Sequence, residues 1–319
     1  MTPSDSPPPR LAELIRRATA ADGSPPFSDG ALVELAQGER ELLWLGPAAA
    51  LSKPGEAEFV VDPDARALGH GTRMLEALLG AGAGPSSGSG AGPSSGSVPS
   101  SGSGAGPSSG PGPVPGRGAG FGGHTLFWAH GDHPAARALA ASHGLVRARE
   151  LLHLEAAVPA RPSAQPAGPG PQESGGNRLS AFTPADAHAW VELNARAFAG
   201  HPEQGAVTRA DLDVLAAEPW FDPGDFLLLW DGAELIGYCW LKVDGGEGEF
   251  YVVGVSPDRQ GEGIGRRLVA AGFARLASRG IRTAHLYVEG DNAAALALYR
   301  SFGFTNRSVD IQYSSSPAG

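Results

Sequence analysis

The sequence predicts an α/β chain built from two tandem copies of one mixed-sheet (α+β) unit, with an insertion in the first copy. Two internal similarities predict this. The segment HGDHPAARALAASHGL (130–145) aligns without gaps with EGDNAAALALYRSFGF (289–304) at an offset of 159 residues. The segment FVVDPDARALGHGT (59–72) aligns with VGVSPDRQGEGIGR (253–266) at an offset of 194. The first copy therefore holds 35 additional residues between its two motifs.

The additional residues coincide with a low-complexity segment. Residues 80–120 are almost entirely Gly, Ala, Ser and Pro, and GAGPSSGSG occurs twice. Such a segment has few apolar side chains to offset the entropy of ordering, so we expect a disordered insertion. A second stretch rich in Pro, Gly and Gln, 158–176, is typical of a linker between domains. We therefore expect domains at 10–157 and 177–314.

The second copy shows helix and strand patterns in a readable order. Thr183 followed by Pro184 is typical of a helix start, and Asp231-Gly232 is typical of a hairpin turn. The expected elements are a helix after 183, a hairpin of strands 225–230 and 235–243, a strand at 249–255, a helix at 265–279, a strand at 284–288 and a helix at 292–302. These elements predict a mixed sheet with helices packed on it.

Composition and charge exclude several classes of function. The formal net charge is −10, which disfavours binding to nucleic acid. The single cysteine, Cys239, allows neither an internal disulfide nor a multi-cysteine metal site, and the nine histidines show no metal-ligand spacing. Neither a leader pattern nor an apolar run of membrane-spanning length is present. We expect a cytoplasmic monomer with a small-molecule substrate and no metal, membrane or nucleic-acid partner.

The glycine-rich stretch 259–266, RQGEGIGR, is the sharpest feature of the sequence. Glycines at alternate positions before a helix allow backbone N–H groups to turn inward, which suits a phosphate or pyrophosphate. The stretch lacks the Gly-Lys-Ser/Thr of a P-loop and the spacing of a dinucleotide-binding loop. The alternative interpretation of such a stretch is a tight turn without a ligand.

A second motif lies beyond this loop. Residues 292–299, NAAALALY, match N-x-x-A-x-x-x-Y. Together the two motifs resemble the Gcn5-related N-acetyltransferase (GNAT) superfamily over residues 178–313, which implies two tandem GNAT-type domains and acetyl-CoA as the cosubstrate. The resemblance implies that the loop binds the pyrophosphate and that the second motif positions the thioester.

Four further segments narrow the resemblance. HPEQG (201–205), AEPWFDP (217–223), WLKV (240–243) and EFYVVGV (249–255), in a tandem chain, resemble the mycothiol synthase (mycothiol acetyltransferase) family. The resemblance implies transfer of acetyl from acetyl-CoA to the cysteinyl amine of cysteinyl-glucosaminyl-inositol, 1D-myo-inositol 2-(L-cysteinylamino)-2-deoxy-glucopyranoside, in mycothiol biosynthesis. It also implies that the first copy is non-catalytic.

The family resemblance also implies a set of contact residues. Substrate contacts fall on Asp29, Glu203, Lys242, Glu249 and Tyr287; at Asp29 the family has the longer Glu. Acetyl-CoA contacts fall on Val253, Gly254, Val255, Gln260, Gly261, Glu262, Gly263, Ile264, Gly265, Arg266, Asn292, Ala293, Ala294, Ala295, Leu296 and Ala297. A second acetyl-CoA site falls on Phe59, Val60, Val61, Ala67, Leu68, Gly69, His70, Gly71 and Thr72, where Ala67-Leu68 departs from the usual start of the loop.

The chemistry of amine acetylation selects two catalytic candidates. An amine attacks a thioester only when deprotonated, so a carboxylate must act as general base, and Glu249 on the strand before the loop is the candidate. The departing thiolate needs a proton donor, which Tyr299 can supply. The structural alternatives are an edge carboxylate for Glu249 and a core aromatic residue for Tyr299. Cys239, in an apolar strand, is expected to be a buried hydrophobic residue.

Two other functions remain compatible with the sequence. One is acetylation of another small amine, such as an amino acid or antibiotic, or of a protein N-terminus. The other is a CoA-sensing module without catalysis, for which neither Glu249 nor Tyr299 would be needed.

Overall fold

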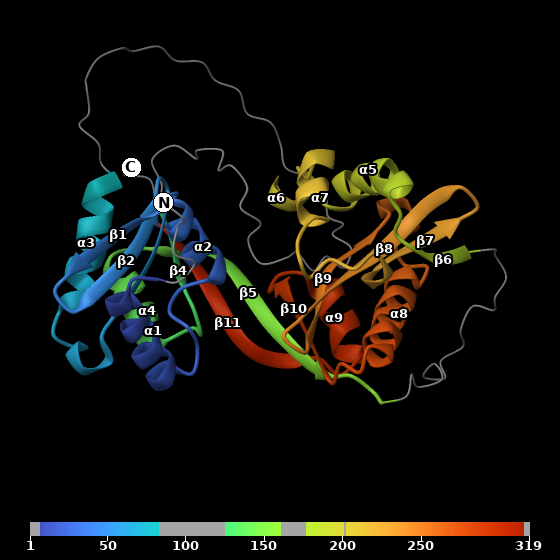
Figure 1. The fold of residues 1–319 in the computed structure, drawn as a ribbon. Coiled ribbons are helices and arrows are strands. Elements are labelled where there is room, and N and C mark those ends of the chain that lie inside the picture. Colours follow the sequence, from blue (N-terminus) through green and yellow to red (C-terminus); the bar gives the residue numbers. More distant parts are fainter. Residues whose placement is uncertain (1–6, 83–124, 161–176, 201, 316–319) are drawn as a thin grey trace, which may run out of the picture. The chain divides into compact units, whose positions relative to one another are not determined.

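The strands and helices of the protein, seen in a computed structural model, form two units whose residues are not contiguous in the sequence (Figure 1). The structure describes residues 7–82, 125–160, 177–200 and 202–315. Unit 1 contains described residues 7–82, 125–150 and 308–315, and unit 2 contains 151–160, 177–200 and 202–307. Most of the expected insertion, 80–120, and of the expected linker, 158–176, lies outside the described residues.

Unit 1 is a sheet with helices on both faces. Its elements are α1 (Pro9–Asp22), α2 (Asp29–Gln37), β1 (Glu41–Leu45), β2 (Ala48–Lys53), β3 (Glu56–Val61), α3 (His70–Gly82), β4 (Leu126–Ala129) and α4 (Pro134–Ser142). Strands β1 to β3 are antiparallel neighbours, and β4 runs parallel to β3. Alternate residues of β2 divide the core: Ala48 and Ala50 pack with α3 and α4, whereas Ala49 and Leu51 pack with α1 and α2.

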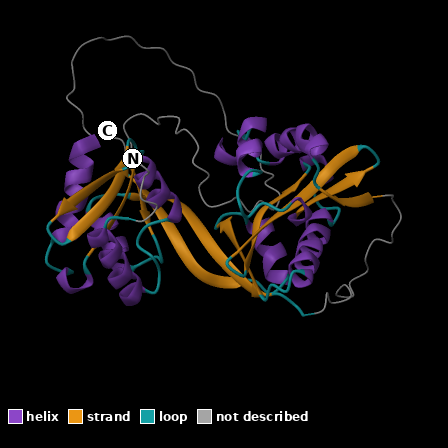
Figure 2. Ribbon diagram, in the orientation of Figure 1, coloured by secondary structure: helices purple, strands orange, loops and turns teal. Residues whose placement is uncertain are grey.

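Unit 2 repeats this plan. Its elements are β6 (Asn177–Ala181), α5 (Ala187–Ala197), α6 (Pro202–Gly205), α7 (Arg209–Leu215), β7 (Phe226–Asp231), β8 (Glu234–Asp244), β9 (Glu247–Val255), α8 (Ile264–Ser278), β10 (Thr283–Glu289) and α9 (Ala293–Ser301). Helix α5 covers one face of the sheet and α8 the other (Figure 2). The hairpin, strands and helices expected in the second copy are confirmed. The limits of α8 and α9 differ by one residue from those expected, whereas the helix expected after Thr183 begins with a 3-10 turn, Pro184–Asp186, and becomes α-helical at Ala187.

Aromatic side chains fill the core beneath α5. The ring of Trp190 lies edge-on to Phe226, Tyr238 and Trp240 at 5.6–5.7 Å between centroids. The opposite face is closed by the approach of α8, because a Cβ atom at Gly272 would lie only 2.4 Å from the Phe250 ring. The centre of the sheet is therefore tightly packed on both faces, which fixes the strands that carry the candidate site.

Two long strands, β5 and β11, each have residues in both units. Strand β5 (Val146–Ala157) starts in unit 1, but its residues Leu151–Ala157 pair antiparallel with β10 in unit 2. Strand β11 (Thr305–Ser314) starts in unit 2, but its residues Ile311–Ser314 pair antiparallel with β4 in unit 1. The units therefore differ from the sequence-based ranges 10–157 and 177–314, because strand pairing outside each repeat carries no local sequence signal.

Candidate active site

Strand β9 places Glu249 at the middle of the sheet of unit 2. Glu249 is a register partner of Lys242 on β8 and of His285 on β10. Only 9% of the residue is exposed. Burial raises the pKa of Glu249 to about 7, while the positive charge of Lys242 opposes the shift. A carboxylate with this pKa is divided between its acid and base forms near neutral pH, which suits proton transfer.

A bulge follows Glu249 on the same strand. Leu241 pairs with Phe250 and Trp240 with Val252, so Tyr251 has no register partner on β8. Phe250 packs against Phe273 of α8, whereas the Tyr251 ring lies against Trp220 and Trp240, off the other face.

Strands β9 and β10 pair over a short stretch only. The described register joins them in parallel at two positions, Gly248 with Ala284 and Glu249 with His285. The predicted cofactor contacts Val253, Gly254 and Val255 lie beyond this pairing, at the buried end of β9. Main-chain groups on that edge of β9 are therefore not used by a β10 ladder in the described structure, and they can serve a ligand.

The glycine-rich loop leads from β9 into α8. Gly261 and Gly263 have φ of +82° and +80°, which side chains rarely adopt, and no atom lies within 4 Å of a Cβ built at either position. Gly263 is the N-cap of the 15-residue helix α8. Arg259 stabilises the loop through Glu262 at 2.9 Å and Asp231 at 3.0 Å. The exposed loop backbone at a helix N-terminus fits the pyrophosphate of a nucleotide cofactor.

The second motif lies on α9. Asn292 caps this helix, since its Oδ1 accepts a hydrogen bond from Ala295 N–H at 3.0 Å. The predicted contacts Ala293, Ala294, Ala295, Leu296 and Ala297 form the first turns of α9. Tyr299 is fully buried, and its ring lies 5.7 Å from that of Phe304.

Aromatic rings cover β10 and its neighbour β5. The Tyr287 ring is stacked on His153 of β5, with centroids 4.4 Å apart and planes at 16°. His285 lies edge-on to His153 at 5.3 Å, and burial lowers the pKa of His285. Neither histidine was predicted from the sequence as a site residue. The alternation of β10 could have indicated His285, which shares a face with Tyr287, but nothing local indicated that β5 would join this sheet.

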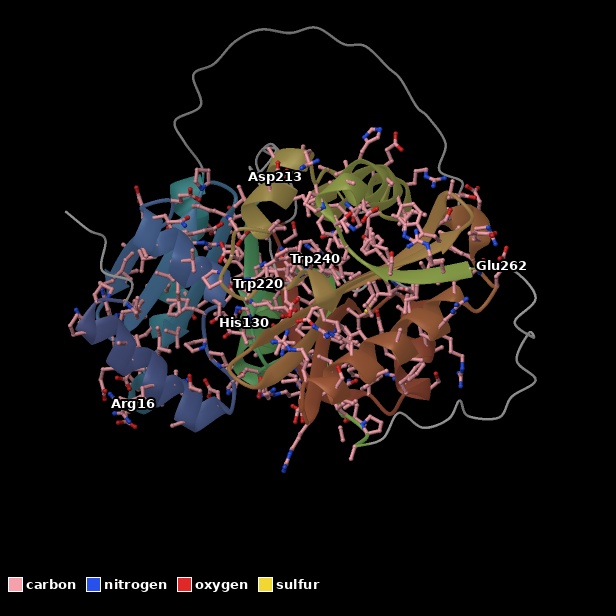
Figure 3. The ribbon with its side chains drawn as sticks, turned by 45° about the vertical axis from the view of Figure 1, so that its right-hand side comes forward. Arg16, His130, Asp213, Trp220, Trp240 and Glu262 are labelled. Atoms are coloured by element: carbon pink, nitrogen blue, oxygen red, sulfur yellow. The ribbon has the colours of Figure 1, made fainter. Side chains whose placement is uncertain are left out.

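Lys242 and Trp220 form a pair beside Glu249. The Lys242 Nζ lies 5.3 Å from the Trp220 ring centroid, a cation–π contact. The Trp220 ring lies 6.0 Å from that of Trp240, and Figure 3 shows the two tryptophans close together. Trp220 therefore belongs to the surroundings of the predicted contact Lys242, whereas in the sequence it stood out only as part of the AEPWFDP segment.

Helix α6 carries the predicted contact Glu203, whose side chain lies outside the described residues. Its neighbour Gln204 is buried and anchors the helix: the Nδ2 of Asn194 donates to the Gln204 carbonyl at 2.7 Å, and Gln204 Nε2 donates to Asn194 Oδ1 at 3.1 Å. Tyr238 also donates to that Asn194 oxygen, at 2.6 Å. This buried network fixes the backbone that carries Glu203.

Unit 1 contains the matching loop and the remaining predicted contact. Ala67 and Gly69 have φ of +60° and +80°, close to the values of Gly261 and Gly263. Ala67 stands where unit 2 has Gly261, and the backbone nevertheless follows a similar course. An alanine in this left-handed conformation costs about 1 kcal/mol of backbone strain relative to glycine. The remaining predicted members of this site are Phe59, Val60 and Val61 at the end of β3, then Leu68, and His70, Gly71 and Thr72 at the start of α3. Asp29 is exposed at the first position of α2.

The thiol of the single cysteine, Cys239, was expected from the sequence to be a buried apolar group. Cys239 is fully buried, and burial raises its thiol pKa well above the usual range, so the thiol is an unreactive core group at neutral pH.

Within the described residues, no three His, Cys, Asp or Glu side chains come together as a potential metal site. Among the same residues, no helix combines the length and apolar character needed to cross a bilayer.

Comparison with known proteins agrees with this geometry. The Acetyltransferase (GNAT) family model matches residues 188–304. A mycothiol acetyltransferase from Clavibacter michiganensis subsp. michiganensis is 45% identical over 95% of this chain and 90% of its own length. The chain belongs to the mycothiol acetyltransferase family. A member from Thermobispora bispora is 38% identical over 94% of this chain and 93% of its own length.

Solved structures extend the likeness to the fold. A GCN5-related N-acetyltransferase from Sphaerobacter thermophilus has a TM-score of 0.63 at 19% identity, covering 99% of this chain and 94% of its own. A tandem GNAT protein from the clavulanic acid biosynthesis pathway has a TM-score of 0.57 at 14% identity, covering 97% and 95%. These matches confirm the tandem GNAT fold. This member of the mycothiol acetyltransferase family is therefore a GNAT acetyltransferase.

Proposed function

We propose that the enzyme transfers the acetyl group of acetyl-CoA to the cysteinyl amine of cysteinyl-glucosaminyl-inositol, giving mycothiol and CoA. The single observation that carries the chemistry is Glu249, a buried carboxylate between Lys242 and His285 with a pKa of about 7. The substrate assignment is supported by relatives that match nearly the whole chain and are named mycothiol acetyltransferase.

Glu249 is the general base of the proposed reaction. The acceptor amine is mostly an ammonium ion at neutral pH and must lose a proton before it can form the new bond. Glu249 removes that proton, directly or through one water molecule. A carboxylate of ordinary pKa is a weaker base, so the burial of Glu249 brings its basicity closer to that of the amine.

Two other groups assist the acyl transfer. Acetyl-CoA supplies an activated thioester when bound. Main-chain N–H groups of 253–255 donate hydrogen bonds to the thioester carbonyl and stabilise the charge that develops on its oxygen. Tyr299, on the helix α9 that carries the second motif, donates a proton to the departing thiolate.

The binding residues divide into two groups. The loop 260–266 and the first turns of α9, 292–297, hold the coenzyme in unit 2, and the loop geometry of unit 1 supports a second coenzyme site at 59–61 and 67–72. Lys242, Glu249 and Tyr287 contact the acceptor from unit 2, with Glu203 on α6. Asp29, at the start of α2, stays a predicted acceptor contact. A monomeric, cytoplasmic enzyme remains our prediction.

The test is the release of CoA by the purified enzyme with a panel of acceptors. Because cysteinyl-glucosaminyl-inositol itself carries a thiol, CoA is quantified after chromatographic separation. Rapid release with this acceptor, and not with free cysteine or simple amines, is expected. Selective release of CoA with a different amine would show that this amine, and not cysteinyl-glucosaminyl-inositol, is the substrate. If the protein binds the coenzyme but releases CoA with none of the acceptors, a CoA-sensing role would be favoured.

A further inference from the structure

A pocket of about 470 Å³ opens beside the turn that joins β8 to β9. It is lined by Glu218, Trp220, Val243, Asp244, Gly245 and Gly246, none of which is among the predicted contact residues. Its volume lies within the range of about 300–1,000 Å³ that is usual for small-molecule sites. All of these residues belong to unit 2.

The walls of the pocket combine one aromatic ring with two carboxylates. Trp220 is half-buried and is held by Tyr251, whose ring centroid lies 5.3 Å from that of Trp220. Glu218 and Asp244 are exposed, and neither side chain forms a hydrogen bond or ion pair with another described residue. The backbone at Gly245 and Gly246 is open, because a Cβ atom at either position would meet nothing within 4 Å.

This composition selects a class of ligand. Ionised carboxylates accept hydrogen bonds from hydroxyl groups, and an indole ring packs against the C–H groups of a saturated ring. Two unpaired negative charges repel phosphates and carboxylic acids. The pocket therefore suits an uncharged ring that bears several hydroxyl groups, a cyclic polyol or a sugar.

The pocket lies next to Lys242, the register partner of Glu249, because Trp220 in its wall contacts the Lys242 ammonium group. Burial raises the pKa of Tyr251, and the negative charges of Glu249 and Glu218 raise it further, so both carboxylates act on this phenol. Lys242 likewise acts on Glu249 and contacts the Trp220 ring. Glu249 is three positions after Gly246, a distance of roughly 10 Å along extended chain at about 3.3 Å per residue. A cysteinyl amide and one sugar ring can bridge such a span.

We propose that this pocket binds the terminal inositol ring of the acceptor, with Glu218 and Asp244 accepting its hydroxyl hydrogens and Trp220 packing against its ring. This assignment rests on the proposed function, which places the acceptor amine at Glu249. The affinity of the enzyme for the acceptor then depends on this pocket, whereas the rate of the acetyl-transfer step is independent of it.

The experiment compares two acceptors, cysteinyl-glucosaminyl-inositol and cysteinyl-glucosamine, which lacks the inositol. The double variant Glu218→Gln/Asp244→Asn changes exposed side chains without structural partners. It should raise KM at least tenfold for the full acceptor, leave its kcat within twofold, and leave KM for cysteinyl-glucosamine unchanged. Glu234→Gln, an exposed position at the opposite end of β8, is the matched control and should change neither KM.

An unchanged KM for the full acceptor, or an equal rise for both acceptors, would overturn the proposal. Trp220→Phe gives a second measurement, because it keeps an aromatic ring and should raise KM less than Trp220→Leu. Saturation-transfer NMR with glucosaminyl-inositol separates this proposal from the proposed function. This measurement can be made even if no acceptor is acetylated. Binding of glucosaminyl-inositol to the native enzyme, with loss of binding in the double variant, would support the proposed pocket. If glucosaminyl-inositol does not bind to the native enzyme, the proposal is refuted.

Discussion

The Nδ1 atom of His130 lies 3.1 Å from Oδ2 of Asp310, which joins the end of β4 to β11. The other ring nitrogen of His130, Nε2, lies 3.3 Å from Oε2 of Glu58. Glu58 in turn accepts hydrogen bonds from the N–H and hydroxyl of Ser28, each at 2.8 Å, where α2 begins. Although burial opposes it, the two carboxylates raise the pKa of His130 to about 10. His130 is therefore a cation inside unit 1 at neutral pH.

Replacing Asp310 should destabilise unit 1. In Asp310→Asn, His130 loses one of its two carboxylate partners, and we expect unfolding to become easier by about 3 kcal/mol at pH 7. The stabilisation from a raised histidine pKa is fully present below pH 6.5 and is lost as the pH rises through about 10. The deficit of the variant should therefore shrink above pH 10 in denaturant titrations. As a control, Asp213→Asn removes only an exposed ion pair with Arg209 on α7 and should change stability by less than about 0.5 kcal/mol.

Glu249→Gln should abolish base catalysis while leaving the coenzyme site intact. We expect kcat at pH 7 to fall by about 10²–10⁴-fold, with partial recovery at high pH as free amine accumulates. In the native enzyme, kcat/KM should rise with pH through about 7, because only the ionised carboxylate accepts a proton. Stopped-flow rates over pH 5–10 check both expectations. A loss that is uniform across pH would indicate a binding role instead.

The same substitution should stabilise the fold. Glu249 has a folded pKa raised from 4.5 to about 7, so the folded state holds its proton more tightly than the unfolded state. Below about pH 4.5 the carboxyl group is neutral in both the folded and the unfolded state, so it does not lower the free energy of unfolding. Above pH 7 the native protein must ionise a buried group, at up to about 3 kcal/mol. Glu249→Gln should therefore raise Tm at pH 8, and the gain should vanish near pH 4.

The stack of His153 on Tyr287 should matter for acceptor binding. His153→Ala removes a ring contact of about 1 kcal/mol, so KM for the acceptor should rise about fivefold with kcat unchanged. His153→Phe keeps a flat ring and should restore KM. If the alanine and phenylalanine variants behave alike, the stack does not position Tyr287. A parallel Tyr287→Leu variant shows whether Tyr287 itself contributes.

Tyr299→Phe should lower turnover without weakening coenzyme binding. The substitution removes only the hydroxyl, and the ring contact with Phe304 persists. We expect kcat to fall by about 10²-fold, while the Kd for acetyl-CoA, measured by calorimetry, stays within twofold. Native turnover in this variant would exclude Tyr299 as the proton donor.

Local patterns predicted the second repeat well. The cap at Thr183, the turn at Gly232 and the glycine-rich loop before α8 are set by residues close in sequence, and each was found at or near its expected position. Glu249 was expected on the strand before that loop, and it lies on β9. Local patterns of this kind are sufficient because cap and turn chemistry acts over a few residues.

Contacts between distant segments were not predictable in this way. His153 reaches the β10 face only because β5 joins the sheet of unit 2, and Asp310 reaches His130 only because β11 joins that of unit 1. The burial that raises the pKa of Glu249 likewise depends on neighbouring strands. A single sequence without co-varying positions contains no record of such pairings.

The exchange of β5 and β11 has a consequence for synthesis. Residues Ile311–Ser314 of β11, which pair with β4, emerge from the ribosome after every other described strand. Unit 1 is translated first, yet its sheet is completed last. A nascent chain halted at Arg307 should therefore present β4 as an open strand edge, which makes the interval before the final residues emerge the period of greatest risk of aggregation.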